Sequence, residues 1–305
     1  MEENYGHKPV LLRECLDALQ IKPDGIYVDG TLGRAGHTRE ILARGGEVLG
    51  IDRDDQALEE VGALGLAGLE IAKGKHGDLK RIAYEKEWRE VDGILLDLGV
   101  SSPQLDDAGR GFSFMREGPL DMRMDRSGGV TAAELIASAP AAELERLFRE
   151  YGEEPQARRI AKAIAAARSE GARFATTVEL ADFVERTIGR HGGHHPATRV
   201  FQALRMEVND ELGELKRALA GGMELLKRGG RFAVITFESL SDREVKRFFA
   251  AHVGKMRSLQ RGGEEWEGVE PRAKAVTRKA VTASPEEIDL NPRARSAKLR
   301  VIEKE

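Results

Sequence analysis

The sequence predicts an α/β fold in which helices cover both faces of a mostly parallel β-sheet, interrupted by an inserted all-helical domain. Three short apolar segments bounded by turn residues predict buried parallel strands, because a strand that is covered on both faces is apolar throughout. Helical patterns alternate with these strands, as in sheets built from right-handed crossovers. The alternation stops over residues 132–190, where we find only helical patterns, and then resumes.

The length and composition favour a globular protein of the cytosol. The chain has 305 residues, of which 41% are hydrophobic and 33% charged, enough to build a full core in one large domain or two. No apolar run approaches the roughly 20 residues that cross a bilayer, and the first residues lack the pattern of a secretory signal. We therefore expect a cytoplasmic protein with no membrane partner. The single cysteine, Cys15, cannot form an internal disulfide and is interpreted as a core residue.

The first part of the α/β domain is predicted to span residues 1–107. We expect strands at residues 26–31, 47–52, 69–73 and 91–97, and helices at residues 10–19, 38–43 and 54–61.

The inserted helical domain is predicted at residues 108–200, with helices at 141–151, 156–168 and 176–188. In the last of these, Val178, Ala181, Val184 and Ile188 line one face. Thr176 and Glu179 have the spacing of a capping box.

The second part of the α/β domain is predicted at residues 201–305. It begins with one long amphipathic helix whose apolar stripe runs from Phe201 to Leu219. We then expect a strand at residues 230–237, a helix capped at Ser241, a loop at 261–268 and a closing edge strand at 297–302.

The turn over residues 29–37 has the features of a ligand-binding turn. Its glycines at 30, 33 and 36 let the backbone approach a ligand, although ordinary strand-to-helix turns also use glycine. Asp52 ends the second strand, where a carboxylate can accept both hydroxyls of an adenosine ribose. The glycine spacing is GxxGxxG, which fits a dinucleotide poorly. A sulfonium cofactor carries a positive charge and no phosphate, so it favours carboxylates such as Asp29 and Asp97, although Asp97 could also cap the next turn.

Two basic stretches could follow a phosphate backbone. The formal charge of −4 argues against a protein that binds nucleic acid over its whole surface. However, residues 186–205 contain four arginines and no acid, and residues 271–300 contain eight lysines and arginines against three acids. The alternative is that both stretches are solvated faces. His191, His194 and His195 lie among flexible glycines with no nearby cysteine or carboxylate, so we expect no metal site.

Several unusual strings carry a family resemblance: LGVSSPQLDD from residue 98, RGFSFM from 110, GPLDMRMD from 118, HPATRVFQALR from 195, FESLSDR from 237 and NPRARS from 291. They closely resemble the bacterial 16S rRNA cytosine-N4 methyltransferase family of the MraW type, and the likeness covers nearly the whole chain. The resemblance implies a Rossmann-like class I methyltransferase sheet with a helical insertion. It also implies methyl transfer from S-adenosylmethionine to N4 of a cytidine in the decoding region of 16S rRNA, within the 30S subunit. The oligomeric state stays open.

By position, the resemblance assigns seven cofactor contacts: Ala35, Gly36, His37, Asp52, His76, Asp97 and Gln104. Ala35 stands where the family usually has glycine, which is tolerable if its φ is negative. His76 stands where we expect an aromatic residue, and an imidazole can still stack on adenine. Glu238 replaces a histidine in the Phe-x-Ser-Leu string.

Methyl transfer to N4 needs positioning rather than a covalent enzyme residue. The N4 lone pair is delocalised into the ring, so an acceptor for its N–H helps to localise it. The catalytic candidate is Asp97, with a backbone carbonyl of residues 98–104 as the alternative. A flipped base could lie on Phe112, Phe114 and Met115, which could equally form a plug between the domains. Asp121 and Asp125 could read the cytosine or bind Arg123 or Arg126.

Two other classes of function remain open at this point. A nucleotide-dependent oxidoreductase would need NAD(P), which the glycine spacing disfavours. A non-catalytic ribosome assembly protein would retain the cofactor fold without using it.

Overall fold

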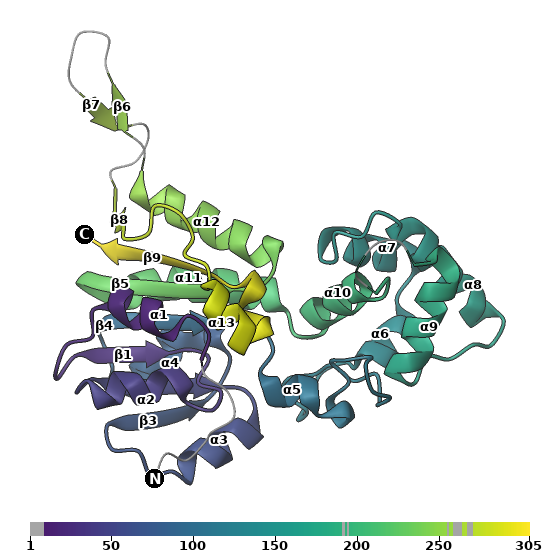
Figure 1. Cartoon of the computed structure of the whole chain (residues 1–305), viewed down its shortest axis with the longest axis horizontal. Helices are drawn as coiled ribbons and strands as arrows, with labels where there is room; N and C mark the ends of the chain where they lie inside the picture. The colour runs from purple at the N-terminus through teal and green to yellow at the C-terminus, as the bar shows by residue number, and fades with distance from the viewer. Residues whose placement is uncertain (1–8, 191–192, 194, 255, 259–263, 267–270) are drawn as a thin grey trace. The chain divides into compact units, whose positions relative to one another are not determined.

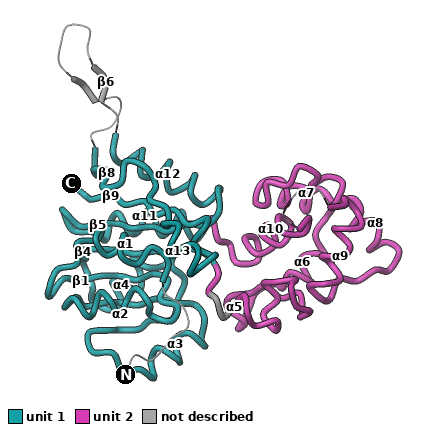
Figure 2. The backbone as a smooth tube through the Cα atoms, viewed as in Figure 1, with its two compact units in different colours: residues 1–99, 213–305 teal, residues 100–212 magenta. Residues whose placement is uncertain are grey.

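The computed structural model describes residues 9–190, 193, 195–254, 256–258, 264–266 and 271–305 (Figure 1). The chain divides into two compact units (Figure 2): Met1–Gly99 with Gly213–Glu305, and Val100–Leu212. The predicted insertion, residues 108–200, lies inside the second unit, which extends past it at both ends.

The first unit is built on a seven-stranded sheet in the order β3-β2-β1-β4-β5-β9-β8. The first five of these strands run parallel, and β9 and β8 pair antiparallel. The strands are β1 (Ile26–Asp29), β2 (Glu47–Asp52), β3 (Leu69–Lys73), β4 (Val91–Asp97), β5 (Leu226–Thr236), β8 (Ala273–Ala275) and β9 (Lys298–Lys304). The prediction that the strand at residues 297–302 forms the edge of the sheet is therefore wrong, because β9 pairs on both sides and the short β8 forms the edge.

Helices cover both faces of this sheet, which confirms the predicted fold class. Alternate side chains of β4 point to opposite faces, since Ile94 and Leu96 belong to one buried cluster and Leu95 to another. The first cluster packs under α4 (Leu79–Glu85), α11 (Glu211–Leu225) and α12 (Ser239–Val253). The second packs under α1 (Leu12–Leu19), which buries Cys15 there as predicted. Two more helices, α2 (Gly36–Ala43) and α3 (Asp55–Gly62), complete the alternation.

The second unit is helical around its own buried core. Its helices are α5 (Ser102–Asp106), α6 (Ala132–Ser138), α7 (Ala141–Glu150), α8 (Ala157–Ser169), α9 (Thr177–Ile188) and α10 (Thr198–Val208). The capping box of Thr176 and Glu179 is confirmed in both directions. It was predictable because it depends only on local spacing.

The single long helix predicted across residues 201–219 is wrong. The chain breaks between α10 and α11, where Asp210 has a φ of 49°. Asn209 is buried there; its Nδ2 donates to the Met122 carbonyl at 2.8 Å and its Oδ1 accepts from the Met124 amide at 2.9 Å. These tertiary bonds end α10, whose Phe201 and Leu204 join the core of the second unit.

Three smaller expectations are also corrected. β5 begins at Leu226 rather than at residue 230. The residue before α12 is Glu238, and Ser241 donates to the Glu238 carboxylate at 3.3 Å from inside the first turn instead of capping the helix. Within the segment predicted as a loop, β7 (Glu264–Trp266) pairs with β6 (Met256–Ser258), and the rest of that segment lies outside the described residues. None of the helices in the described ranges is long and apolar enough to span a membrane.

Candidate cofactor and active site

Three carboxylates meet at the carboxyl edge of the sheet, because Asp29, Asp52 and Asp97 end the adjacent parallel strands β1, β2 and β4. This is the edge at which open α/β sheets bind ligands. No lysine or arginine among the described residues forms an ion pair with any of the three. The edge therefore presents negative charge that suits a cationic ligand.

Asp29 is used to brace the turn that follows β1. It is 2% exposed, and it accepts hydrogen bonds from the Thr31 amide at 3.1 Å and from the Thr38 hydroxyl at 2.7 Å. Burial raises the pKa of Asp29 to about 6, against the opposing effect of these bonds. Neither threonine has a role in the sequence-based prediction, although a hydroxyl residue in the first turn after a strand-ending acid was an available signal.

Asp52 ties the glycine turn to the end of β2. One carboxylate oxygen accepts from the Gly33 amide at 2.8 Å, and the other accepts from the Asp54 amide at 3.0 Å. Burial raises its pKa. Each oxygen of a carboxylate offers two lone-pair positions, so Asp52 keeps capacity for the hydroxyls of a ribose.

Asp97 has one carboxylate oxygen with no partner in the part of the chain that the structure describes. Its backbone amide donates to the Thr31 hydroxyl at 2.7 Å, which joins the end of β4 to the turn after β1. Its Oδ1 is buried and has no hydrogen bond to any described residue, while 27% of the side chain remains exposed. Burial, and then the charge of Asp29, raise the pKa of Asp97 to about 7. It is a carboxyl group that can exchange a proton near neutral pH.

His37 is a neutral imidazole that faces Asp97. Its Nε2 lies 3.1 Å from the Val10 carbonyl, which can only accept, so Nε2 carries the hydrogen and Nδ1 keeps its lone pair. Nδ1 lies 3.9 Å from Asp97 Oδ2. Burial lowers the pKa of His37 to about 4. The preceding residue, Gly36, lets this segment lie close to Pro9, because a Cβ on residue 36 would lie 2.5 Å from Pro9 Cγ.

Ala35 adopts a left-handed conformation, with φ at 59°, so the condition under which a methyl group would be tolerated without strain, a negative φ, is not met. This conformation costs an L-residue roughly 1–2 kcal/mol, and glycine would avoid that cost. The methyl group of Ala35 is fully buried in a cluster with Leu32 and Val61. Burying a methyl group contributes about 0.8 kcal/mol, and alanine restricts the unfolded chain more than glycine does, so the strain is largely offset.

His76 lies beside the glycine turn, in the short 3₁₀ helix η1 (His76–Asp78) that follows β3. A Cβ on Gly30 would lie 3.4 Å from His76 Cβ. His76 is 7% exposed, and its Nε2 has no hydrogen-bond partner among the described residues. Burial, and then the charges of Arg53, Arg217 and Lys75, lower the pKa of His76 to about 3. A neutral ring at this place suits adenine.

Gln104 belongs to the second unit, on α5, whereas the other six predicted contacts belong to the first. Its side-chain oxygen accepts from the Ser101 amide at 3.0 Å.

The strings of the second unit that carry the family resemblance are used largely to build that unit. Phe112 is 8% exposed in its core, whereas Phe114 stacks on His195 at 4.6 Å between ring centroids, and Met115 is 83% exposed. Asp121 binds Arg123 through two hydrogen bonds of 2.8 and 2.9 Å, which favours the arginine-binding alternative for this residue.

The histidine cluster is described only in part. His195 accepts from the Ala197 amide through Nδ1 at 3.1 Å and lies 3.0 Å from Glu185 through Nε2, so both ring nitrogens are engaged within the unit. His191 and His194 lie outside the described residues. Within the described ranges, no three His, Cys, Asp or Glu residues are grouped to hold a metal ion.

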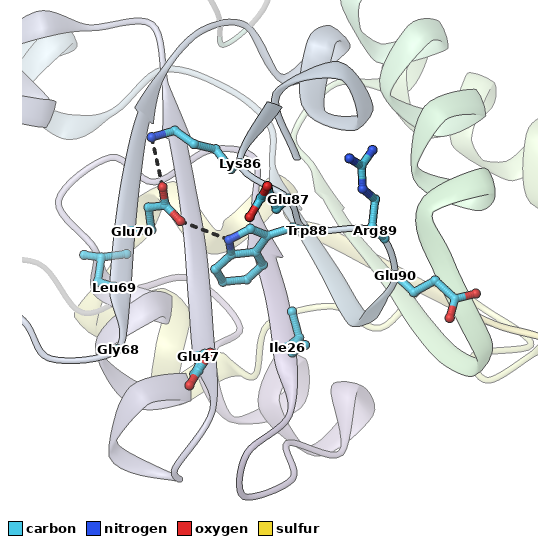
Figure 3. A pocket seen from close by; sticks show the side chains of 10 residues that line it. All are labelled: Ile26, Glu47, Gly68, Leu69, Glu70, Lys86, Glu87, Trp88, Arg89 and Glu90. Atoms are coloured by element: carbon cyan, nitrogen blue, oxygen red, sulfur yellow. Dashed lines mark hydrogen bonds and ion pairs between the residues drawn. The ribbon is translucent and has the colours of Figure 1, made fainter. Parts of the chain in front are cut away.

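A surface hollow of about 520 Å³ lies at the opposite edge of the sheet (Figure 3). Ile26, Glu47 and Leu69 line it where β1, β2 and β3 begin. Glu70 accepts there from Trp88 Nε1 at 3.0 Å and pairs with Lys86 at 2.9 Å. Because ligands bind open α/β sheets at the carboxyl ends of strands, this hollow is not the cofactor site.

The residues at the carboxyl edge fit S-adenosylmethionine. Two buried polar atoms there, Asp97 Oδ1 and His76 Nε2, lack partners among the described residues, and buried polar groups normally have one. The carboxylates match a sulfonium charge, and Asp52 has acceptor capacity for a ribose.

Comparison with known proteins decides the family. The chain matches the MraW methylase family over residues 4–305. The chain belongs to the MraW methylase family. It is therefore a methyltransferase, and S-adenosylmethionine is its methyl donor, which confirms the resemblance and the cofactor predicted from the sequence.

Relatives of this methylase are similar over almost their full length. The chain is 49% identical over 304 residues to a ribosomal RNA small subunit methyltransferase H of Parvibaculum lavamentivorans, covering 98% of this chain and 89% of the relative. It is 47% identical over 311 residues to the protein of the same name in Cupriavidus necator, covering 98% and 92%. Among solved structures, an rRNA methylase from Streptococcus thermophilus shares 12% identity with a TM-score of 0.43, covering 97% of each chain.

Proposed function

We propose that this methylase transfers the methyl group of S-adenosylmethionine to N4 of a cytidine in the decoding region of 16S rRNA, within the 30S subunit in the cytoplasm. The observation that carries the proposal is Asp97 Oδ1, which has no hydrogen bond to any described residue and belongs to a side chain that is 27% exposed beside the cofactor turn. A cytosine amino group donates hydrogen bonds, and such an oxygen would accept one of them. The names of the relatives support the small-subunit RNA as the substrate.

Residues of the first unit would hold the cofactor from several sides. Asp52 would accept the ribose hydroxyls, His76 would form a wall for adenine, and the backbone at Ala35, Gly36 and His37 would line the rest. Gln104 remains a predicted contact on the strength of the family resemblance. The bound cofactor supplies an activated methyl group on a sulfonium.

Asp97 would then act on the amino group of the base. By accepting the N4–H, Asp97 would localise the lone pair on the nitrogen that receives the methyl group. The product nitrogen must lose a proton, and a carboxylate whose pKa is about 7 is matched to take it near neutral pH. His37 Nδ1 lies 3.9 Å from Asp97 Oδ2. Because His37 is neutral, it places no positive charge beside the carboxylate that would weaken its affinity for the proton.

The RNA substrate fits the basic stretch over residues 271–300. In the first unit this stretch includes η3 (Pro292–Ser296), where Arg295 is exposed. Lys298 and Arg300 of β9 are instead engaged with Asp242, so they contribute less free charge.

The test is the variant Asp97→Asn, assayed for binding of S-adenosylmethionine by calorimetry and for methylation of 30S subunits and of naked 16S RNA. We expect S-adenosylmethionine to bind more weakly, because the variant lacks the carboxylate charge that favours the sulfonium. We expect turnover at saturating cofactor to fall by about 100-fold or more, as for general acid–base groups. The matched control is Asp92→Asn at the other end of β4, which should keep turnover. Full turnover by Asp97→Asn would remove Asp97 from the chemistry, and methylation of naked RNA but not of subunits would reject the 30S substrate.

A further inference from the structure

The η1 turn that carries His76 is held by an acid from a distant helix. Glu214 of α11 is buried, with 3% of its side chain exposed, and its Oε2 accepts from the Gly77 amide at 3.1 Å. Gly77 directly follows His76. The bond joins the connection after β3 to a helix that lies far away in the sequence.

Gly77 is what permits this contact. A Cβ on residue 77 would lie 2.1 Å from Glu214 Oε2 and 3.1 Å from the Glu214 carbonyl oxygen. No real Cβ approaches that closely, so any other residue would push the carboxylate or the turn away. The glycine and the acid therefore form one fitted pair.

Two cations offset the charge of the buried carboxylate. Arg217 Nη2 lies 2.7 Å from Glu214 Oε1, and Lys75 Nζ lies 3.5 Å from the same oxygen. A buried carboxylate is costly unless it is paired and hydrogen-bonded, and Glu214 is both. The charges of the same two cations lower the pKa of His76, so Glu214 orders charges that act on the ring as well as the backbone after it.

We propose that Glu214 is a positioning residue for cofactor binding, which fixes the η1 turn through the Gly77 amide so that the His76 ring stands as the wall for adenine. The inference rests on the cofactor contact proposed for His76.

Glu214 is not needed to attach α11 to the sheet. Leu215, Leu219 and Met223 of the same helix pack into the main core of the first unit. Removing the Glu214 carboxylate should therefore free the η1 turn while the helix stays in place. This separates a positioning role from a merely structural one.

The experiment compares Glu214→Leu, Glu214→Gln and His76→Ala for S-adenosylmethionine affinity by calorimetry and for kcat on 30S subunits at saturating cofactor. For Glu214→Leu and His76→Ala we expect Kd to rise about tenfold or more, because a hydrogen bond to a charged group or a stacking wall is lost. We expect kcat to stay within about twofold for Glu214→Leu. Glu214→Gln keeps an acceptor for the Gly77 amide and should restore Kd to within about threefold of the wild type.

The matched control is Glu224→Leu, which removes an exposed acid from the same helix and breaks its ion pair with Lys80 of α4, without touching η1. It should leave Kd unchanged. If Glu214→Leu does not fold, Gly77→Ala tests the same pair by steric displacement and should also raise Kd.

Three outcomes overturn the proposal. In the first, His76→Ala weakens cofactor binding, but Glu214→Leu does not, or Gly77→Ala does not if it is used instead. This outcome would leave the proposed function intact. In the second, Glu214→Leu lowers kcat with Kd unchanged. In the third, His76→Ala binds the cofactor normally, which rejects the His76 contact itself. The Asp97→Asn assay separates that failure from failure of the proposed reaction.

Discussion

The three acids at the carboxyl edge differ in what the fold has already used them for. The oxygens of Asp29 accept from Thr31 of the turn and from Thr38 of α2, and those of Asp52 each accept one backbone amide. Asp97 keeps an Oδ1 with no partner among the described residues. The places of Asp52 and Asp97 at the carboxyl ends of strands were predictable, because strand ends and their spacing are visible in the sequence. The bonds that distinguish the three acids were not, since they depend on side-chain rotamers that tertiary packing selects.

Asp52→Asn should weaken S-adenosylmethionine binding by about tenfold to 100-fold, because a neutral amide accepts ribose hydroxyls less strongly than a carboxylate does. Calorimetric titration measures the affinity, and a thermal melt separates it from unfolding. Asp55→Asn is the control, since Asp55 is an exposed neighbour paired with Lys73. Equal affinity in Asp52→Asn and wild type would exclude Asp52 from the site.

The raised pKa values of Asp29 and Asp97, about 6 and about 7, predict a pH dependence of cofactor affinity. As pH rises through these values, both acids lose protons and gain the charge that favours a sulfonium. S-adenosylmethionine should therefore bind more tightly at pH 8 than at pH 5.5, relative to S-adenosylhomocysteine, whose sulfur is neutral. Because folding raises the pKa values of these two acids, the unfolded chain loses their protons first as pH rises. They therefore lower the stability of the cofactor-free protein between about pH 4 and pH 7.

The affinity ratio of the two ligands, measured by titration across this range, checks the effect. Asp97→Asn should flatten most of the dependence. A ratio that does not change with pH would show that neither acid faces the sulfonium.

At the scale of elements, local signals were reliable and tertiary ones were not. The capping box before α9 needs only Thr176 and Glu179, and it forms as predicted. The apolar stripe across residues 201–219 continues through a break that Asn209 makes with the loop at Met122 and Met124. Nothing in the period of the stripe marks that break, because the partners of Asn209 are distant in the sequence.

Asn209→Ala should destabilise the protein by about 2–4 kcal/mol, because it leaves the buried Met124 amide and Met122 carbonyl without partners. Urea unfolding measures the loss. Thr198→Ala, at the exposed start of the same helix, should change stability by less than about 0.5 kcal/mol. A loss as small for Asn209→Ala would mean that the break in the helix does not depend on this side chain.

At the scale of the whole molecule, alternation of strands and helices predicted the fold class, while the limits of the two units depended on packing. The second unit reaches Leu212 because Phe201 and Leu204 of α10 join its core rather than the sheet. The pairing of β9 on both sides was likewise not visible, since β8 has only three residues. The strings that carry the family resemblance predicted the function better than they predicted the roles of individual residues. Asp121 is an example, because its carboxylate accepts hydrogen bonds from Arg123 within the second unit.

RNA binding is expected to depend on the basic stretch around η3. Changing Arg293 and Arg295 together to alanine should weaken RNA binding and lower the salt slope of log K by about 1.4, which corresponds to two phosphate contacts on single-stranded RNA. Cofactor affinity should stay unchanged. The control removes two exposed cations of α12, Lys246 and Arg247. Filter binding across a salt series makes the measurement, and an unaltered slope would assign the two arginines to the fold.

The most direct test of the account is the identity of the methylated nucleoside. Unmodified 30S subunits are incubated with the protein and labelled S-adenosylmethionine, and the rRNA is digested and mapped by mass spectrometry against standards of N4-methylcytidine, 5-methylcytidine and 2′-O-methylcytidine. We predict that the label appears as N4-methylcytidine, in a single fragment of the decoding region. Label on C5, on a ribose or on another base, or no label from protein that binds the cofactor, would contradict the account.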